Sequence, residues 1–424
     1  MMLSRRLPIN ISVGKVRRLH VLALGLIIEY TCLLLILFNQ RRLALTVFCT
    51  DDKYPAIVYF ELIFGGIYLL SNLAVLFAIK SKLVVKLSAK PQHVIYSATT
   101  LCAFSFMFLL LTPKLFFLRF SLLLLFMVIF LFLHIYEQLL TIFCLLNMIR
   151  TRVQYRSFAN MFFMIVGVSI ISAKAIHDAT NYFVDLDLRV FFSFLPITVL
   201  GVITILLSRQ FCFKINSYDI KRLSHVMRSL RYSWKEQLTR LTANLTIGAF
   251  MIEWYANTPN QNYIYSGWDA RVSNLLLVVN NVIALLIVYF YNVFINQINK
   301  RIWLAIILLL FILCDFIIDL MPGGSYFVIC SFFLMSILFN MIIKTINQLI
   351  HYQINDLKLY IFSLIWGSGV GIVFFCFLFD TLNLVVMHNT LIISDSVMSN
   401  ITIGVVIVLC LFCISNIAKI DQKV

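Results

Sequence analysis

The stretch Arg209–Lys235, which reads RQFCFKINSYDIKRLSHVMRSLRYSWK, decides how the rest of the chain is interpreted. It is the longest stretch that cannot lie in lipid, and it is rich in Lys and Arg. Apolar segments of roughly twenty residues, the length that crosses a bilayer as a helix, flank it on both sides. The stretch therefore predicts a water-exposed basic bridge between two membrane-embedded halves.

The composition supports a membrane protein. Of the 424 residues, 62% are hydrophobic and only 12% are charged. A soluble domain carries roughly a quarter charged residues, so this chain has too little polar surface to cover a soluble globule. The long continuous apolar runs exclude a β-barrel, whose strands alternate in short segments. The expected class is an all-α polytopic membrane protein.

The net charge of +16 raises the question of nucleic acid as a partner. The Lys and Arg residues gather in short loops between apolar segments, which is the distribution that the positive-inside rule describes. No nucleic-acid partner is therefore expected. Two of the ten Cys, Cys410 and Cys413, have CxxC spacing, but they lie in an apolar segment without a His or acidic companion, and phosphate-loop, GxSxG and HExxH motifs are absent. We therefore expect no enzyme activity, no cofactor and no metal site.

The hydropathy pattern predicts about twelve transmembrane helices. Loops that follow even-numbered helices are basic, which places both termini in the cytoplasm. The predicted organisation is a six-helix lobe at 1–208, a basic cytoplasmic linker at 209–232 and a second six-helix lobe at 233–424. The predicted helices cover residues 19–39, 56–79, 94–112, 120–148, 161–176, 190–208, 233–255, 274–298, 302–320, 326–350, 359–382 and 401–417.

Ionisable residues inside predicted membrane helices are candidates for function, because burying a charge in lipid is costly without a cavity or a partner. The site candidates among them are three cations and four acids, namely Arg240, Lys344, Lys174, Glu29, Glu61, Glu137 and Asp315. Structural ion pairs and side chains that reach the membrane surface are the alternative interpretations. Glu29 lies in the middle of its predicted helix, so it is expected to face a cavity.

Polar residues that are not ionisable also occur in the predicted helices of the second lobe. Their amides are expected to form hydrogen bonds between helices, with the lining of a water-filled cavity as the alternative. These residues are Asn280, Asn281, Asn292, Asn340 and Asn347. His177 and Asp178 begin a polar segment that is predicted to be an outer loop.

Three segments resemble the Wzx-type polysaccharide flippases of the multidrug/oligosaccharidyl-lipid/polysaccharide exporter superfamily. DDKYPAIVYFE at 51–61 resembles part of the opening hairpin of that family, and LLNMIRTRVQYRSFANMF at 145–162 resembles its junction between helices 4 and 5. The clearest similarity runs from SYDIKRLSHVMRSLRYSWKEQLTR through to VSNLLLVV at 217–279. The glycine-rich loop that usually follows the first helix in the family is missing.

The resemblance implies a transporter that flips a polyprenyl-diphosphate-linked oligosaccharide across a bacterial inner membrane by alternating access. A diphosphate needs cations in a cavity of low dielectric constant, for which Arg240 is the first candidate, followed by Lys344 and Lys174. Glu29, Glu61, Glu137 and Asp315 are the candidates for coupling to H⁺ or Na⁺. The implied partners are the lipid bilayer, the lipid-linked oligosaccharide and a polysaccharide polymerase.

Two other functions stay open on the sequence. One is a drug or metabolite antiporter of the same fold. The other is a seven-helix ion channel of the chemoreceptor type, which would require about five of the predicted spans to be merged or discarded and which the alternating charge of the loops opposes.

Overall fold

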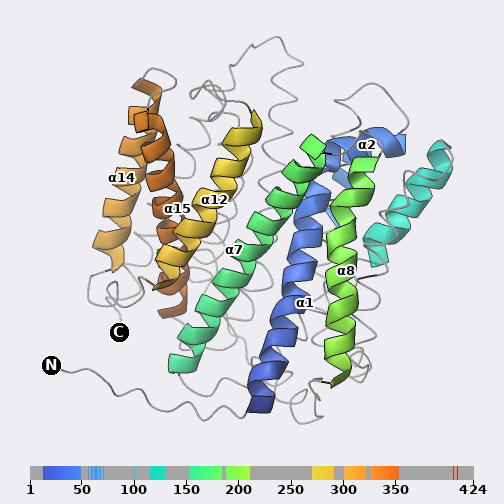
Figure 1. The fold of residues 1–424 in the computed structure, drawn as a ribbon, viewed down its shortest axis with the longest axis horizontal. Helices are drawn as coiled ribbons and strands as arrows, with labels where there is room; N and C mark the ends of the chain where they lie inside the picture. Colours follow the sequence, from blue (N-terminus) through green and yellow to red (C-terminus); the bar gives the residue numbers. More distant parts are fainter. Residues whose placement is uncertain are drawn as a thin grey trace.

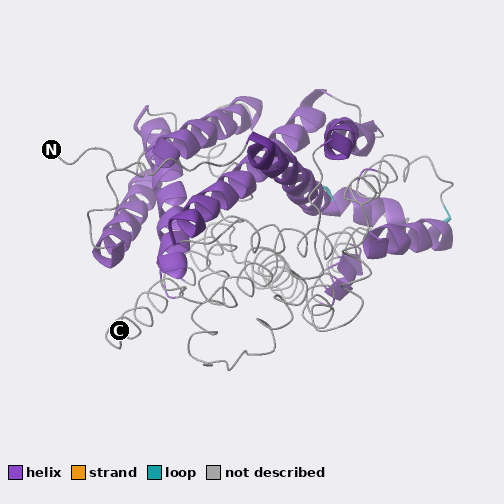
Figure 2. Cartoon of the chain, turned by 90° about the horizontal axis from the view of Figure 1, so that it is seen from below, coloured by secondary structure: helices purple, strands orange, loops and turns teal. Residues whose placement is uncertain are grey.

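The computed structural model describes the chain in separate parts, and every regular element in them is helical (Figure 2). The described parts are residues 13–48, single positions between 56 and 70, residue 100, residues 115–129, 152–183, 188–210, 270–290, 300–320 and 326–352, and positions 404 and 408.

Seven helices make up most of the described part of the fold. They are α1 (Val13–Phe38), α2 (Gln40–Phe48), α7 (Arg152–Phe183), α8 (Arg189–Gln210), α12 (Ala270–Phe290), α14 (Lys300–Leu320) and α15 (Tyr326–Tyr352). A further apolar helical segment covers Phe116–Ile129.

The long helices stand side by side in a row (Figures 1 and 2). The row runs α14, α15, α12, α7, α1 and α8, and each helix contacts the next. The short helix α2 follows α1 and lies across the end of the row (Figure 1). Helix α7 is central, because it contacts α1 and α8 from the first half of the sequence and α12 and α15 from the second half.

The predicted helix at 161–176 is much longer in the structure. Helix α7 has 32 residues, which corresponds to about 48 Å at 1.5 Å per residue. A hydrocarbon core is only about 30 Å thick, so the ends of α7 extend beyond it. The polar residues at both ends continue the helix although they are not apolar. His177 and Asp178, predicted to begin an outer loop, are therefore part of α7.

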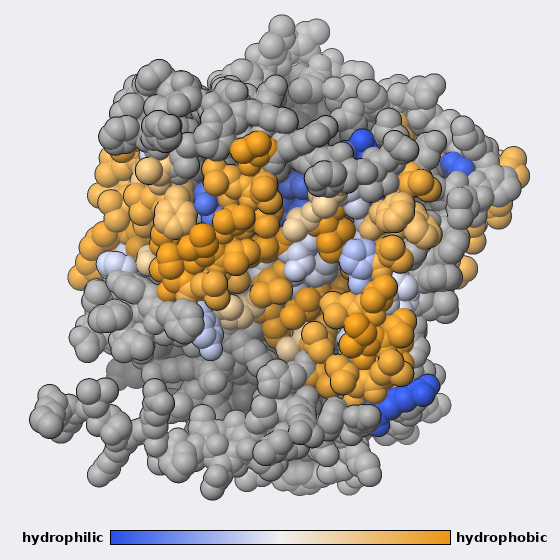
Figure 3. Space-filling view, viewed as in Figure 1, coloured by the Kyte–Doolittle hydropathy of each residue, from blue (hydrophilic) through white to orange (hydrophobic). Residues whose placement is uncertain are grey.

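The described surface of the molecule is apolar while several buried positions are polar. On α8, Val202 and Leu206 are exposed, whereas Ser193, Thr204 and Ser208 are buried. Helices α12 and α14 also expose Leu, Ile and Val side chains. Hydrophobic residues dominate the described part of the face shown in Figure 3. This distribution is the reverse of a water-soluble protein and fits a surface that contacts lipid.

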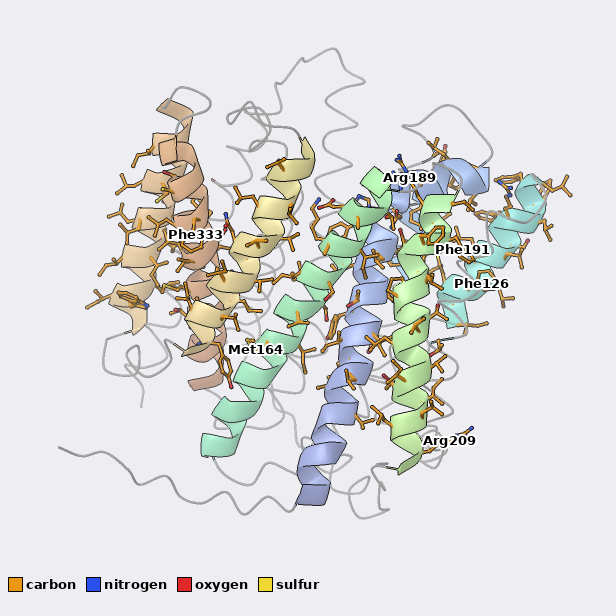
Figure 4. The ribbon with its side chains drawn as sticks, in the orientation of Figure 1. Phe126, Met164, Arg189, Phe191, Arg209 and Phe333 are labelled. Carbon is orange, nitrogen blue, oxygen red and sulfur yellow. The ribbon has the colours of Figure 1, made fainter. Side chains whose placement is uncertain are left out.

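Helix α8 shows the length that a membrane requires. Among the described residues, one helix is long and apolar enough to cross a membrane, and it covers Arg189–Arg209. Figure 4 shows Arg189 and Arg209 at the two opposite ends of α8. Charged residues at the ends and apolar residues between them are the pattern expected of a membrane-spanning helix.

Two glycines permit close contacts between helices. A Cβ atom at Gly201 on α8 would lie 3.0 Å from the Cβ atom of Thr100. A Cβ atom at Gly167 on α7 would lie 2.9 Å from a methyl group of Leu285 on α12. Small residues at helix interfaces let helices approach closely in membrane proteins. The second contact joins the two halves of the sequence.

Candidate functional site

A cluster of polar side chains lies where the end of α7 meets α1, α2 and α8. We call it the α7 cluster, and it consists of Lys174, His177, Asp178 and Asn181 on α7 and of Arg42 on α2. Lys174 and Asp178 lie four positions apart, as do His177 and Asn181, so the two members of each pair are neighbours on the surface of α7. The helix therefore presents one cation, one acid, an imidazole and an amide to its neighbours within about two turns.

Lys174 and Asp178 form a buried ion pair. The Nζ atom of Lys174 is 3.1 Å from Oδ1 of Asp178, and the two side chains are only 12% and 10% exposed. The ammonium also lies 6.0 Å from the centre of the Phe38 ring on α1. Lys174 is therefore held inside the protein, beside a carboxylate and an aromatic ring, and does not reach outward into water.

His177 and Asn181 connect α7 to α2. Nε2 of His177 and Nδ2 of Asn181 are 2.9 Å apart, and Arg42 donates a hydrogen bond of 2.6 Å to Oδ1 of Asn181. The ring of Phe38 lies 5.8 Å from the ring of His177. These contacts link α1, α2 and α7, because Phe38 ends α1 and Arg42 belongs to α2.

A second connection joins α7 to α8 at the same level. The hydroxyl groups of Thr180 and Ser193 are 3.1 Å apart and buried. Thr180 also donates to the carbonyl of His177 at 2.9 Å, and Ser193 donates to the carbonyl of Arg189 at 2.7 Å. The cluster therefore lies at a junction of four helices, α1, α2, α7 and α8.

Lys344 lies in the second half of the sequence, on α15. It is 2% exposed, and its Nζ atom donates a hydrogen bond to the carbonyl of Val288 on α12. Val288 is near the end of α12, where a positive charge is favoured by the helix dipole. The geometry gives Lys344 a role in joining α12 to α15.

The polar residues around that junction are also buried. Asn340 donates to the carbonyl of Ser336 at 2.9 Å, and Thr345 donates to the carbonyl of Met341 at 2.7 Å, both within α15. The hydrogen bond that Asn340 donates to Ser336 is therefore within its own helix, whereas the sequence predicts hydrogen bonds between helices. Asn280 and Asn281 on α12 are buried as well.

The other predicted site residues are distributed over the chain. Glu29 is 1% exposed in α1, close to the contact in which Ser169 on α7 donates to the carbonyl of Ile27 at 3.4 Å. Asp315 lies in α14. Arg240, Glu61 and Glu137 fall outside the described residues, as do the side chains of Asn292 and Asn347. Lys174, Lys344 and Glu29 thus lie on three different helices, α7, α15 and α1.

Sequence patterns alone do not single out most of the α7 cluster. They predict a loop at His177 and Asp178, and they give no role to Asn181 or Arg42. The spacing of four residues between Lys174 and Asp178, and again between His177 and Asn181, is the signal that a longer predicted helix would have revealed. Within the described part of the chain, no group of three or more His, Cys, Asp or Glu is arranged to hold a metal ion.

Comparisons with known proteins identify structures with a similar fold. No protein-family model matches the sequence, and no curated protein matches it significantly. Solved structures do match in shape. A bacterial homologue of the human lysosomal transporter Spinster has a TM-score of 0.59 at 12% identity, with 97% of this chain and 98% of that chain covered.

Two further structures are similar along nearly the whole length. The human organic anion transporter MFSD10 has a TM-score of 0.57 at 11% identity, with 95% of this chain and 99% of that chain covered. The nucleoside transporter NupG has a TM-score of 0.56 at 12% identity, with 95% of this chain and 99% of that chain covered. The chain has the MFS transporter fold. It is therefore an all-helical, multi-pass membrane fold, as the composition predicted.

The resemblance to Wzx-type flippases was wrong. The similar structures are MFS-fold transporters, and none of those reported belongs to the flippase superfamily. The resemblance depended on a basic linker between apolar segments and on the order of loops. Any transporter of two membrane-embedded halves needs such a linker on the cytoplasmic side, so these features cannot distinguish one superfamily from another.

Proposed function

We propose that the protein is a transporter that moves a small molecule across a membrane, and that it is not an enzyme. The observation that carries the proposal is the similarity of at least 95% of the chain to transporters that are themselves covered to 98% or more. A similarity of this extent leaves no large part of the chain for another domain. The apolar described surface supports the same conclusion, since it suits a lipid environment.

The proposal includes two halves that open alternately to each side of the membrane. The halves are the predicted lobes at 1–208 and 233–424, joined by the linker at 209–232. Helix α7 contacts α12 and α15, so one helix of the first half lies against two helices of the second. Gly167 and Leu285 are in close contact at this position. An alternating transporter must change such contacts between its halves during each cycle.

The class of substrate is small molecules rather than lipid-linked sugars. The similar structures are described as transporters of organic anions and nucleosides and as a homologue of an iron transporter, so the fold accommodates very different substrates. The fold alone therefore does not select one of them. A drug or metabolite transporter, the alternative from the sequence, agrees better with these structures than an oligosaccharide flippase does.

The experiment is an uptake screen with purified protein in liposomes. Radiolabelled organic anions, nucleosides and ferrous iron are offered separately, and uptake into protein-free liposomes is subtracted. The proposal predicts saturable uptake of at least one class, with competition by unlabelled substrate. If the folded protein instead produced single-channel currents and no saturable uptake, the proposal would fail in favour of a channel.

A further inference from the structure

Lys344 is a buried cation without a counter-ion in the described parts of the chain. The residue is 2% exposed, and its ammonium donates a hydrogen bond to the backbone carbonyl of Val288 on α12. That carbonyl carries no net charge, so it satisfies one of the three donors of the ammonium and leaves the positive charge uncompensated. An ionised group that is removed from water without a counter-ion is costly. In a transporter, such a group is a candidate for binding a charged ligand.

The described helices that pack against α15 do not supply the missing negative charge. They are α12, α14 and α7, and neither α12 nor α15 itself contains an acid. The two acids of α14, Asp315 and Asp319, lie near its end, where the chain turns towards the start of α15. Lys344 lies in the last third of α15, so about 20 Å of helix axis separates it from Asp315. The acid of α7, Asp178, is already paired with Lys174.

Neutral polar side chains lie in a row with Lys344. Ser336, Asn340 and Lys344 follow one another at intervals of four residues, so they lie along one face of α15, and all three are buried. On α12, Asn280 lies two such intervals before Val288 and is also buried. Helices α12 and α15 are in contact and run in the same direction (Figure 1). Asn280 and Ser336 therefore lie at about the same level, roughly 12 Å along the helices from Lys344. We call these four residues the polar row.

The polar row lies beside the boundary between the two halves of the chain. Leu285 lies between Asn280 and Val288 in α12, and its methyl groups lie against Gly167 on α7. Helix α15 also contacts α7. Transporters that work by alternating access bind their substrate where the two halves meet. A ligand of the polar row is therefore next to the contacts that have to change during transport.

We propose that the polar row binds the substrate, and that the substrate is a small organic anion whose carboxylate or phosphate group lies against Lys344. The inference rests on the proposed transport function and names its substrate class. The anion supplies the counter-charge that Lys344 lacks, and the ammonium holds it as a compact point charge. Asn340 and Asn280 add hydrogen bonds to neutral groups of the same molecule. A neutral molecule of the same shape leaves the ammonium uncompensated and therefore binds more weakly.

Pairs of small molecules that differ in charge test the substrate class without a transport assay. Full-length protein in nanodiscs of uncharged phosphatidylcholine is titrated in a calorimeter with nicotinate and nicotinamide, with uridine monophosphate and uridine, and with glucose 6-phosphate and glucose. We expect at least one anion to bind about tenfold more tightly than its neutral partner. Equal affinities within every pair, or no binding by any of the anions, would overturn the proposal. Stabilisation by phosphatidylglycerol in the discs but by no soluble anion would assign the site to a lipid headgroup and overturn it as well.

Variants show whether Lys344 is the residue that holds the anion. For the anion that binds, Lys344→Met should weaken binding about tenfold or more, because the bound charge loses its counter-ion. The matched control is Arg209→Gln, which removes an exposed cation at the end of α8 and should bind like the wild type. Unchanged affinity in Lys344→Met, or the same loss in both variants, would contradict the assignment. Should Lys344→Met fold poorly, Lys344→Gln removes the same charge and gives the same readout.

The uptake screen separates this inference from the proposed function. Saturable uptake of a neutral nucleoside that Lys344→Met leaves unchanged would keep the transport function and overturn the anionic substrate. Binding of an anion through Lys344, without saturable uptake of any class, would keep the anion site and overturn the transport function.

Discussion

At the scale of single residues, the buried polar groups are the informative feature. In a soluble protein a buried Lys would be unusual, and in a membrane protein it signals either a partner or a function. Lys344 has a partner of an unusual kind, the backbone carbonyl of Val288 on a neighbouring helix. No ion-pair partner of Lys344 is present in the described residues. Its role is therefore testable by removing the charge while keeping the volume.

Lys344→Met should be tolerated much better than Lys344→Ala. The Met variant loses one hydrogen bond, which contributes about 1 kcal/mol to the free energy of unfolding. The Ala variant also leaves a cavity between α12 and α15, and such cavities cost about 3 kcal/mol. Thermal unfolding in detergent measures the difference. If Lys344→Met unfolds like the wild type and yet abolishes transport, Lys344 contacts the substrate, as the sequence first suggested.

Gly201 allows a second test at the residue scale. A methyl group there would collide with Thr100, so Gly201→Ala should lower the free energy of unfolding by about 1–3 kcal/mol through overpacking. Gly66 is the matched control, since a Cβ atom there meets nothing within 4 Å. Gly66→Ala should be neutral or slightly stabilising, because Ala favours a helix over Gly. Equal melting temperatures for both variants would contradict the close contact at Gly201.

At the scale of elements, the sequence predicted several helices closely and others poorly. The predicted spans 190–208, 302–320 and 326–350 lie within two residues of α8, α14 and α15. In contrast, α7 and α1 begin before the predicted starts at residues 161 and 19, because hydropathy detects what lies in lipid and not where a helix ends in water. For the same reason Asp178, which lies in α7, is predicted to be in a loop. The contact of Arg42 with Asn181, 139 positions apart, was also beyond the reach of local patterns.

The exposed face of α8 offers a test that belongs to this scale. Val202 is 48% exposed in the middle of the helix, so Val202→Asp would place a carboxylate against lipid. Insertion of such a residue costs about 3 kcal/mol at the centre of a membrane helix. We expect a strong loss of the protein fraction that resists alkaline extraction from membranes. Arg209→Gln, at the end of the same helix, should insert normally, and normal insertion of Val202→Asp would exclude a lipid-facing surface on α8.

At the scale of the whole molecule, the question is whether the two halves of the chain move against each other. The contact between Gly167 on α7 and Leu285 on α12 joins the halves, whereas Leu26 on α1 and Ile165 on α7 pack together inside the first half. These two contacts differ in what an alternating mechanism demands of them. A contact between the halves must change during the cycle, and a contact within one half can stay fixed.

Crosslinking should therefore stop transport at one contact and leave it intact at the other. In a background without other cysteines, Gly167→Cys with Leu285→Cys is oxidised in liposomes, and uptake of the substrate is measured before and after a reducing agent. We expect loss of uptake on oxidation and recovery on reduction, because a covalent bond prevents the halves from separating. Leu26→Cys with Ile165→Cys should crosslink and still transport. Undiminished uptake with a complete crosslink between residues 167 and 285 would mean that α7 and α12 move as one body, and that the moving boundary of the molecule lies elsewhere.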